Sequence, residues 1–173
     1  MINWRSHQHK VEGGGDFAQP TLKAKLFNTD ILEKIMMSNQ SESPCHVFVY
    51  GTLKPNEANF AEYCADKTIA IQRAIAFGEL FALPMGYPAM IVGNDQVHGY
   101  LLSFKNASIL ESLDDLEDYQ SDRLASENAY NRQQIEVFDL EEKSLGMAWA
   151  YLMTSAQVVS FEGIAQLDGW WSA

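Results

Sequence analysis

Short runs rich in β-branched and aromatic residues recur from residue 44 onward, each bounded by turn signals, and they constrain the fold more than any other feature. They predict at least five strands, over residues 46–50, 77–81, 97–104, 132–140 and 147–153. Helices are predicted in only two places, a short one over residues 59–65 and a stronger one over residues 108–119. Because strands outnumber helices and do not alternate regularly with them, we expect an α+β fold with a compact, mostly antiparallel, β-barrel-like sheet and a few short helices.

The distribution of charge divides the chain near residue 43. Residues 1–43 hold five basic and five acidic residues, whereas residues 44–173 hold seven basic and eighteen acidic ones, so the second part carries the whole formal charge of −11. The first part also contains three consecutive glycines and a polar stretch just before residue 44, with one short helical candidate between them. We expect residues 1–43 to be a flexible or variable N-terminal extension and residues 44–173 to be one domain. A natural start at Met36 or Met37 fits the same pattern.

This acidic composition limits the partners of the protein. The chain has 12 Lys and Arg residues against 23 Asp and Glu residues and no run of three basic residues. Phosphate groups are bound by clustered cations, so we expect no nucleic-acid partner and no attachment to an anionic membrane. No segment approaches the ~18 apolar residues of a spanning helix, and the N-terminus lacks the apolar core of a secretory signal. We therefore expect a cytoplasmic protein, monomeric or weakly homodimeric.

The cysteines and histidines predict neither a disulfide framework nor a metal site. Cys45 and Cys64 form no CxxC pair, and we expect both to be buried thiols in a reducing compartment. Two of the four histidines lie in the Gly-rich leader, and His46 and His98 have no ligand pattern near them. We predict no metal and no cofactor.

The predicted helix over residues 108–119 contains one carboxylate in an unusual place. Ser108 and Glu111 have the spacing of a capping box, which predicts the start of the helix. At about 100° per residue the apolar side chains form one arc, and Glu117 falls inside it, whereas Asp114, Asp115 and Asp118 fall on the far, solvent side. Burial and the neighbouring acidic residues should both raise the pKa of Glu117, which suits acid–base chemistry. The alternative is that the helix ends by residue 116 and Glu117 is solvated.

A predicted buried strand over residues 47–50 runs directly into Gly51, Thr52, Leu53 and Lys54. A glycine after a core strand permits a positive φ or a close approach between backbone and ligand. The N–H groups of such a turn can converge on one oxygen atom, as in an oxyanion hole. An ordinary turn is the alternative, and we expect Lys54 to be a solvated turn residue.

Four motifs appear in a characteristic order: FVYGTLKP at residues 48–55, GYPA at 86–89, LDDLE at 113–117 and YNR at 130–132. This arrangement closely resembles the γ-glutamylcyclotransferase-like family, and within it the small proteins related to γ-glutamylamine cyclotransferase. The resemblance covers residues 46 to about 153. It implies a β-barrel-like α+β fold and an enzyme that cyclises a γ-glutamyl unit to 5-oxoproline and expels an amine or amino acid, without a cofactor.

The resemblance also implies roles for particular residues. The family's catalytic glutamate corresponds to Glu117. Its small-molecule γ-glutamyl substrate would be bound by the turn and by flanking tyrosines, which correspond to Tyr50, Gly51, Thr52, Leu53, Tyr130 and Tyr151. Core packing is the alternative role for Tyr130 and Tyr151. Asn59 matches an asparagine that often follows the turn, and capping of the next helix is its alternative role.

Two departures from the family pattern leave the leaving group open. Asp118 stands where the family commonly has glycine, and residues 120–129 form a longer loop than the shortest members have.

Two other classes of function remain as alternatives. One is a non-catalytic module that binds γ-glutamyl or other small ligands. The other is a protein-interaction domain in which Trp149, Trp170 and Trp171 form the contact surface.

Overall fold

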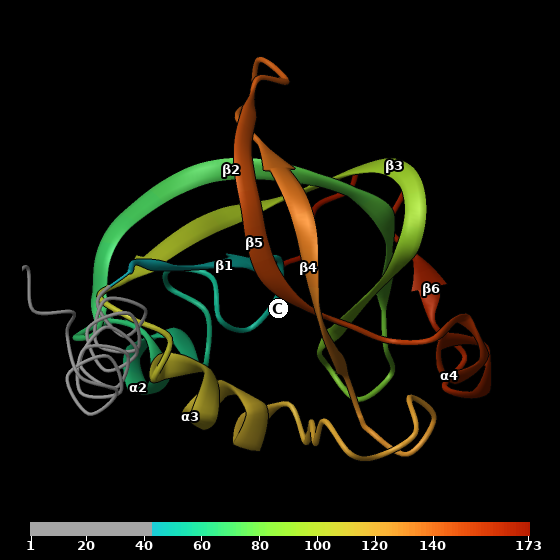
Figure 1. The fold of residues 1–173 in the computed structure, drawn as a ribbon. Helices are drawn as coiled ribbons and strands as arrows, with labels where there is room; N and C mark the ends of the chain where they lie inside the picture. Colours follow the sequence, from blue (N-terminus) through green and yellow to red (C-terminus); the bar gives the residue numbers. More distant parts are fainter. Residues whose placement is uncertain (1–42) are drawn as a thin grey trace, which may run out of the picture. The chain divides into compact units, whose positions relative to one another are not determined.

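The computed structural model describes residues 43–173, and the expected extension over residues 1–43 with its helical candidate lies almost entirely outside them. The described part contains six strands and three helices (Figure 1). The strands are β1 (Cys45–Val49), β2 (Thr68–Ala82), β3 (Pro88–Phe104), β4 (Asn131–Phe138), β5 (Ser144–Leu152) and β6 (Ile164–Ala165). The helices are α2 (Phe60–Tyr63), α3 (Ile109–Leu116) and α4 (Ser155–Ser160). None of these helices is long and apolar enough to cross a membrane.

The strands form one sheet in the order β3-β1-β5-β4-β2-β6, with a further pairing between β2 and β3. That pairing closes a circuit through β1, β5, β4, β2 and β3, and only β6 lies outside it. All pairs are antiparallel except β1 with β5, where Val47 lies opposite Trp149. The expected α+β class and mostly antiparallel sheet are confirmed.

Strands β2 and β3 form a long, curved hairpin that spans the upper part of the view in Figure 1. The prediction placed only short strands within it, because much of the first half of β2 is exposed and shows no alternation of apolar and polar residues. Cross-strand pairing with β3 extends β2 back to Thr68, and a register shift follows Gly78. Backbone hydrogen bonding to a neighbour, rather than side-chain burial, therefore fixes the length of this strand.

Two apolar clusters lie on the two sides of β1. Val47 and Val49 belong to the cluster that also includes Leu113 of α3, whereas Phe48 and Tyr50 belong to the other. This division follows from the alternation of side chains along a strand. The expectation of buried thiols is confirmed, because Cys45 and Cys64 are both free and buried.

Helix α3 differs from its prediction at both ends. Ser108 makes no capping bond with its side chain, and Asn106 Oδ1 accepts hydrogen bonds from its N–H and hydroxyl groups instead. The predicted capping box is therefore wrong. The helix ends at Leu116, so Glu117 is its C-cap. A capping box that the sequence analysis missed is formed by Thr154 and Gln157 at the start of α4.

Candidate active site

A cavity of about 300 Å³ opens between the end of β1 and the end of α3. All seven residues predicted from the sequence to form the site line it, namely Tyr50, Gly51, Thr52, Leu53, Glu117, Tyr130 and Tyr151. The fold thus brings together residues from segments that are up to about one hundred positions apart. Among residues 43–173, no Lys, Arg or His lines this cavity. Within residues 43–173, no group of three His, Cys, Asp or Glu side chains is placed to hold a metal ion.

Glu117 is held at the cavity by its backbone. Its N–H donates to the carbonyl of Leu113 at 2.9 Å, and its carbonyl accepts from the N–H of Tyr130 at 3.2 Å. Its carboxylate, by contrast, forms no hydrogen bond or ion pair with any residue of the described part of the chain. The carboxylate therefore has its full hydrogen-bonding capacity available for a ligand.

Burial raises the pKa of Glu117 to about 7. The neighbouring acidic residues, which the sequence analysis also invoked, do not contribute to this shift. The alternative of a solvated Glu117 had a correct premise, because the helix does end at Leu116, but the side chain is half-buried in the cavity wall and its pKa is raised rather than left at that of a solvated carboxylate. A carboxyl group with a pKa near neutrality can both accept and donate a proton at physiological pH.

The turn after β1 presents three unused N–H groups. Lys54 N–H donates to the carbonyl of Gly51 at 3.0 Å, which closes the turn. Among the described residues, no acceptor is bonded to the N–H groups of Gly51, Thr52 or Leu53. Consecutive free N–H groups in a turn bind anions, so the turn can hold a carboxylate or a developing oxyanion.

Gly51 is required here for close packing and not for its φ angle. It lies outside the positive-φ region that three other glycines adopt, so that part of the expectation is wrong. A Cβ at this position would lie 2.6 Å from Cγ of Pro88, which also lines the cavity.

Asn59 supports the same turn, because its Nδ2 donates to Oγ1 of Thr52 at 3.1 Å. It makes no side-chain cap for α2.

Lys54 is not a solvated residue, which corrects the prediction. Its side chain is 1% exposed, and its ammonium donates to the carbonyl of Trp171 and lies 3.6 Å from Oε1 of Glu57. The ammonium also lies 3.7 Å from the centre of the Trp170 ring. Burial lowers the pKa of Lys54. The end of the chain is thereby fastened to the turn, and the buried Trp171 contradicts the idea that the last tryptophans form an exposed contact surface.

Three of the four tyrosines that line the cavity, Tyr50, Tyr130 and Tyr151, direct their hydroxyl protons into the protein. Tyr50 donates to the carbonyl of Tyr151 at 2.6 Å and accepts from the N–H of Met90 at 3.2 Å. Tyr130 donates to the carbonyl of Pro88 at 2.6 Å. Burial raises the pKa of each of the three hydroxyls, and the negative charge of Glu117 adds to this effect. The tyrosines are therefore neutral groups that line the cavity close to Glu117.

Asp114 does not face solvent as the helical wheel predicted. Its Oδ1 accepts a hydrogen bond from the hydroxyl of Tyr151 at 2.7 Å, and its Oδ2 lies 2.5 Å from Nη1 of Arg132. The guanidinium of Arg132 packs between the rings of Tyr119 and Trp149. Asp114 thus links α3 to strands β4 and β5.

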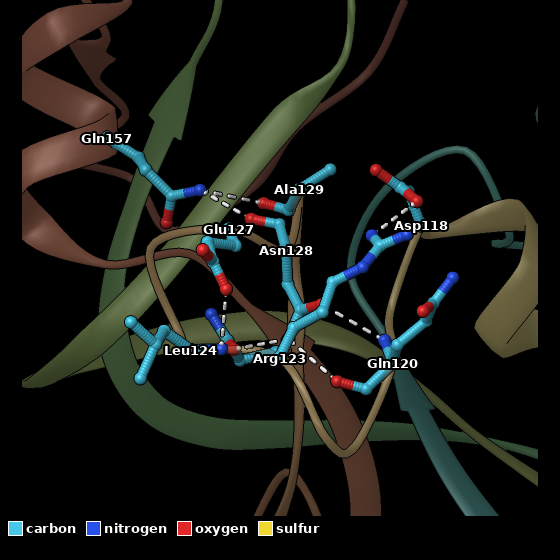
Figure 2. Close-up of polar contacts among 9 residues, drawn as sticks. Asp118, Gln120, Arg123, Leu124, Glu127, Asn128, Ala129 and Gln157 are labelled. Carbon is cyan, nitrogen blue, oxygen red and sulfur yellow. Dashed lines mark hydrogen bonds and ion pairs between the residues drawn. The ribbon is translucent and has the colours of Figure 1, made fainter.

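The loop between α3 and β4 is fixed by a second polar network, shown in Figure 2. Asn128 accepts from the N–H of Gln120 at 3.0 Å and donates to its carbonyl at 3.2 Å, so the two residues clasp the loop. Gln157 of α4 donates to the carbonyls of Asn128 and Ala129 at 2.7 and 3.3 Å. Ala129 and the following Tyr130 line the cavity, so these contacts fix one wall of the site.

Sequence reasoning missed several wall residues. Tyr87 and Pro88 belong to the GYPA motif, which served only to support the resemblance, and both line the cavity. Their signal was therefore present in the sequence. The bracing by Gln157 had no such signal, because α4 lies far from the loop in sequence and was not predicted at all.

Comparisons with known proteins identify the family and agree with this fold. The family model described as "Gamma-glutamyl cyclotransferase, AIG2-like" matches residues 47–173. A gamma-L-glutamyl-butirosin B gamma-glutamyl cyclotransferase from Niallia circulans is 28% identical over 127 residues, which cover 73% of this chain and 75% of that protein.

Solved structures support the fold. An AIG2-like protein from Mus musculus superposes with a TM-score of 0.57 at 22% identity. The superposed region covers 75% of this chain and 88% of the mouse chain. YkqA from Bacillus subtilis superposes with a TM-score of 0.53 at 21% identity. The superposed region covers 75% of this chain and 40% of the YkqA chain. The family match covers most of the chain and includes every residue of the cavity, and we conclude that the protein belongs to the gamma-glutamyl cyclotransferase, AIG2-like family.

Proposed function

We propose that the protein is a γ-glutamyl cyclotransferase that releases 5-oxoproline and a free amine from a γ-glutamyl amine or γ-glutamyl amino acid by intramolecular aminolysis. Family membership supports a cyclotransferase activity. The single observation that carries the proposal is the carboxylate of Glu117, which lines the cavity with no hydrogen-bond or ion-pair partner among the described residues and has a pKa raised to about 7.

Glu117 would carry protons from the attacking nitrogen to the leaving nitrogen. Its carboxylate first removes a proton from the substrate's α-ammonium, and the freed amine attacks the γ-carbonyl carbon of the same molecule. A C–N bond forms and the carbonyl oxygen becomes an oxyanion. Glu117 gives its proton to the leaving nitrogen as the bond to that nitrogen breaks and the carbonyl forms again. The ionised carboxylate then takes the surplus proton from the ring nitrogen and passes it to the released amine, so the products are the neutral lactam and an ammonium, and Glu117 is ionised again. The substrate supplies both nucleophile and electrophile, so this reaction requires no nucleophilic Ser or Cys and no cofactor.

The turn after β1 would stabilise the negative charge of the substrate. The N–H groups of Gly51, Thr52 and Leu53 are free to bind the oxyanion and the α-carboxylate. Removal of one preorganised donor of this kind costs roughly 3 kcal/mol of transition-state stabilisation in other enzymes. The turn is rigidly supported by the bond between Asn59 and Thr52 and by the buried side chain of Lys54.

The lining of the cavity favours an amine as the leaving group. A γ-glutamyl amino acid carries a second carboxylate, and no Lys, Arg or His in the described part of the chain lines the cavity to pair with it. With two carboxylates and one ammonium, a γ-glutamyl amino acid has a net charge of about −1, which the formal protein charge of −11 further disfavours. We therefore expect γ-glutamyl amines to be converted faster than γ-glutamyl amino acids.

Mass-spectrometric detection of 5-oxoproline from matched panels of γ-glutamyl amines and γ-glutamyl amino acids tests the proposal. Formation of 5-oxoproline that is lost in Glu117→Gln and retained in Asp115→Asn is the expected result, because Asp115 is exposed on the same helix. Retention of the compounds without 5-oxoproline would instead indicate a binding module. If the protein neither converts nor binds any of these compounds, both the enzymatic proposal and the binding-module alternative are wrong.

A further inference from the structure

The wall of the cavity contains both hydrogen-bond donors and hydrogen-bond acceptors that no described residue uses. The donors include the free N–H groups of the turn at residues 51–53. The acceptors include the carboxylate of Glu117 and the hydroxyl oxygens of Tyr130 and Tyr151, whose protons are already given to other partners. A hydroxyl that has donated its proton still offers lone pairs. Such a set suits a group that carries a carboxylate and an ammonium side by side.

Tyr151 differs from Tyr50 and Tyr130 in the group that accepts its hydroxyl proton. Tyr50 and Tyr130 donate to backbone carbonyls, whereas Tyr151 donates to the carboxylate of Asp114 at 2.7 Å. No described residue donates a hydrogen bond to the hydroxyl oxygen of Tyr151, which leaves its acceptor capacity unused. Bonds to an ionised acceptor are stronger than bonds between neutral groups, so Asp114 holds this proton firmly away from any ligand.

Asp114 is itself fixed by a cation that does not line the cavity. Arg132 donates to its second oxygen at 2.5 Å, and the guanidinium packs against the ring of Trp149. The carboxylate of Asp114 is thus shared between a cation and a hydroxyl, and both of its oxygens are in use.

We propose that Asp114 is a positioning residue that locks the Tyr151 hydroxyl as a hydrogen-bond acceptor for the substrate's α-ammonium, next to Glu117. This inference rests on the proposed function and adds to it a subsite that binds the α-ammonium group of the substrate. In this subsite Tyr151 touches the substrate, and Asp114 acts only through Tyr151.

Steady-state kinetics with a γ-glutamylalkylamine, and inhibition by the same molecule with hydrogen in place of the α-ammonium, test the inference. Tyr151→Phe preserves the ring and removes the acceptor. We expect it to raise KM by about tenfold or more, the usual effect of one hydrogen bond to a charged group. The value of kcat should stay within about threefold of the wild-type value, and the inhibition constant of the deamino analogue should stay within about twofold of the wild-type value.

A double-mutant cycle tests whether Asp114 acts through Tyr151. Asp114→Ala should raise KM for the substrate by a similar factor, and it should add nothing further when Tyr151 is already phenylalanine. Asp115→Ala on the same helix is the matched control and should leave both constants unchanged. If Asp114→Ala does not fold, Tyr151→Phe alone still decides whether the Tyr151 hydroxyl binds the α-ammonium of the substrate.

Three results would overturn the inference. The first is an equal rise of KM and of the inhibition constant in Tyr151→Phe, which would mean a general distortion of the cavity. The second is an unchanged KM in Tyr151→Phe, and the third is a full additional effect of Asp114→Ala in the phenylalanine background. In all three cases the wild-type protein still forms 5-oxoproline and the proposed function stands. A wild-type protein without turnover would overturn the proposed function and this inference with it.

Discussion

Replacement of Glu117 by glutamine should make the protein more stable at pH 8 and leave its stability almost unchanged at pH 4. Burial raises the pKa of this carboxyl group to about 7 from its ordinary value of 4.5. The folded state therefore binds more protons than the unfolded state between these two values, and the wild-type protein loses stability as pH rises through that window. Glutamine does not titrate, and it replaces a side chain that has no hydrogen-bond or ion-pair partner among the described residues.

The size of the effect follows from the shift. Each pKa unit corresponds to about 1.4 kcal/mol, so the shift of Glu117 limits the gain in the free energy of unfolding to about 3 kcal/mol above pH 7. Because the side chain is only partly buried, water should reduce the gain below this limit.

Urea denaturation of the wild type and Glu117→Gln at pH 4, 6 and 8 measures this difference directly. All other titrating groups are common to the two proteins, so the change with pH isolates Glu117. We expect a difference near zero at pH 4 that grows in favour of glutamine up to pH 8. A difference that is independent of pH, or a wild type that is more stable at pH 8, would refute the reasoning.

Three further predictions concern the turn and the chain termini. Gly51→Ala should raise KM by about tenfold or more and cost about 1–3 kcal/mol of stability, because its Cβ would meet the ring of Pro88; an unchanged KM would remove the turn from the site. Lys54→Met should lower the free energy of unfolding by about 2–4 kcal/mol, because it leaves the carbonyl of Trp171 without its donor. The exposed Lys105→Met should change it by less than about 0.5 kcal/mol, and equal effects of the two variants would contradict the burial argument. Deletion of residues 1–36 should leave turnover and unfolding unchanged, as expected for an extension outside the 47–173 family match; a loss of more than about 1 kcal/mol would show that it packs on the domain.

The location of the site was predictable because it depends on local patterns. Glu117 stood out as a carboxylate on an apolar arc, and the strand that ends in Gly51 indicated a turn with exposed N–H groups. Both features are visible within a window of about ten residues. The structure places them on one cavity because β1 and α3 both pack into the same apolar cluster.

The supporting contacts were not predictable, because they join segments that are distant in sequence. A helical wheel assumes a single buried face, and Asp114 lies off that face, yet Arg132 and Tyr151 approach it from β4 and β5. Lys54 was expected in solvent because an isolated lysine is costly to bury, and its backbone acceptor, the carbonyl of Trp171, is more than one hundred residues away in the sequence.

The central claim is that Glu117 transfers the proton, and the turnover of Glu117→Gln with a γ-glutamyl amine tests it most directly. Glutamine preserves the shape of the side chain but cannot accept a proton from an ammonium group. We expect kcat to fall by about 10²–10⁴ while the substrate still binds, and Asp115→Asn to stay within about tenfold of wild type. A Glu117→Gln variant that keeps more than about a third of the wild-type kcat, or a larger loss in Asp115→Asn, would contradict the account.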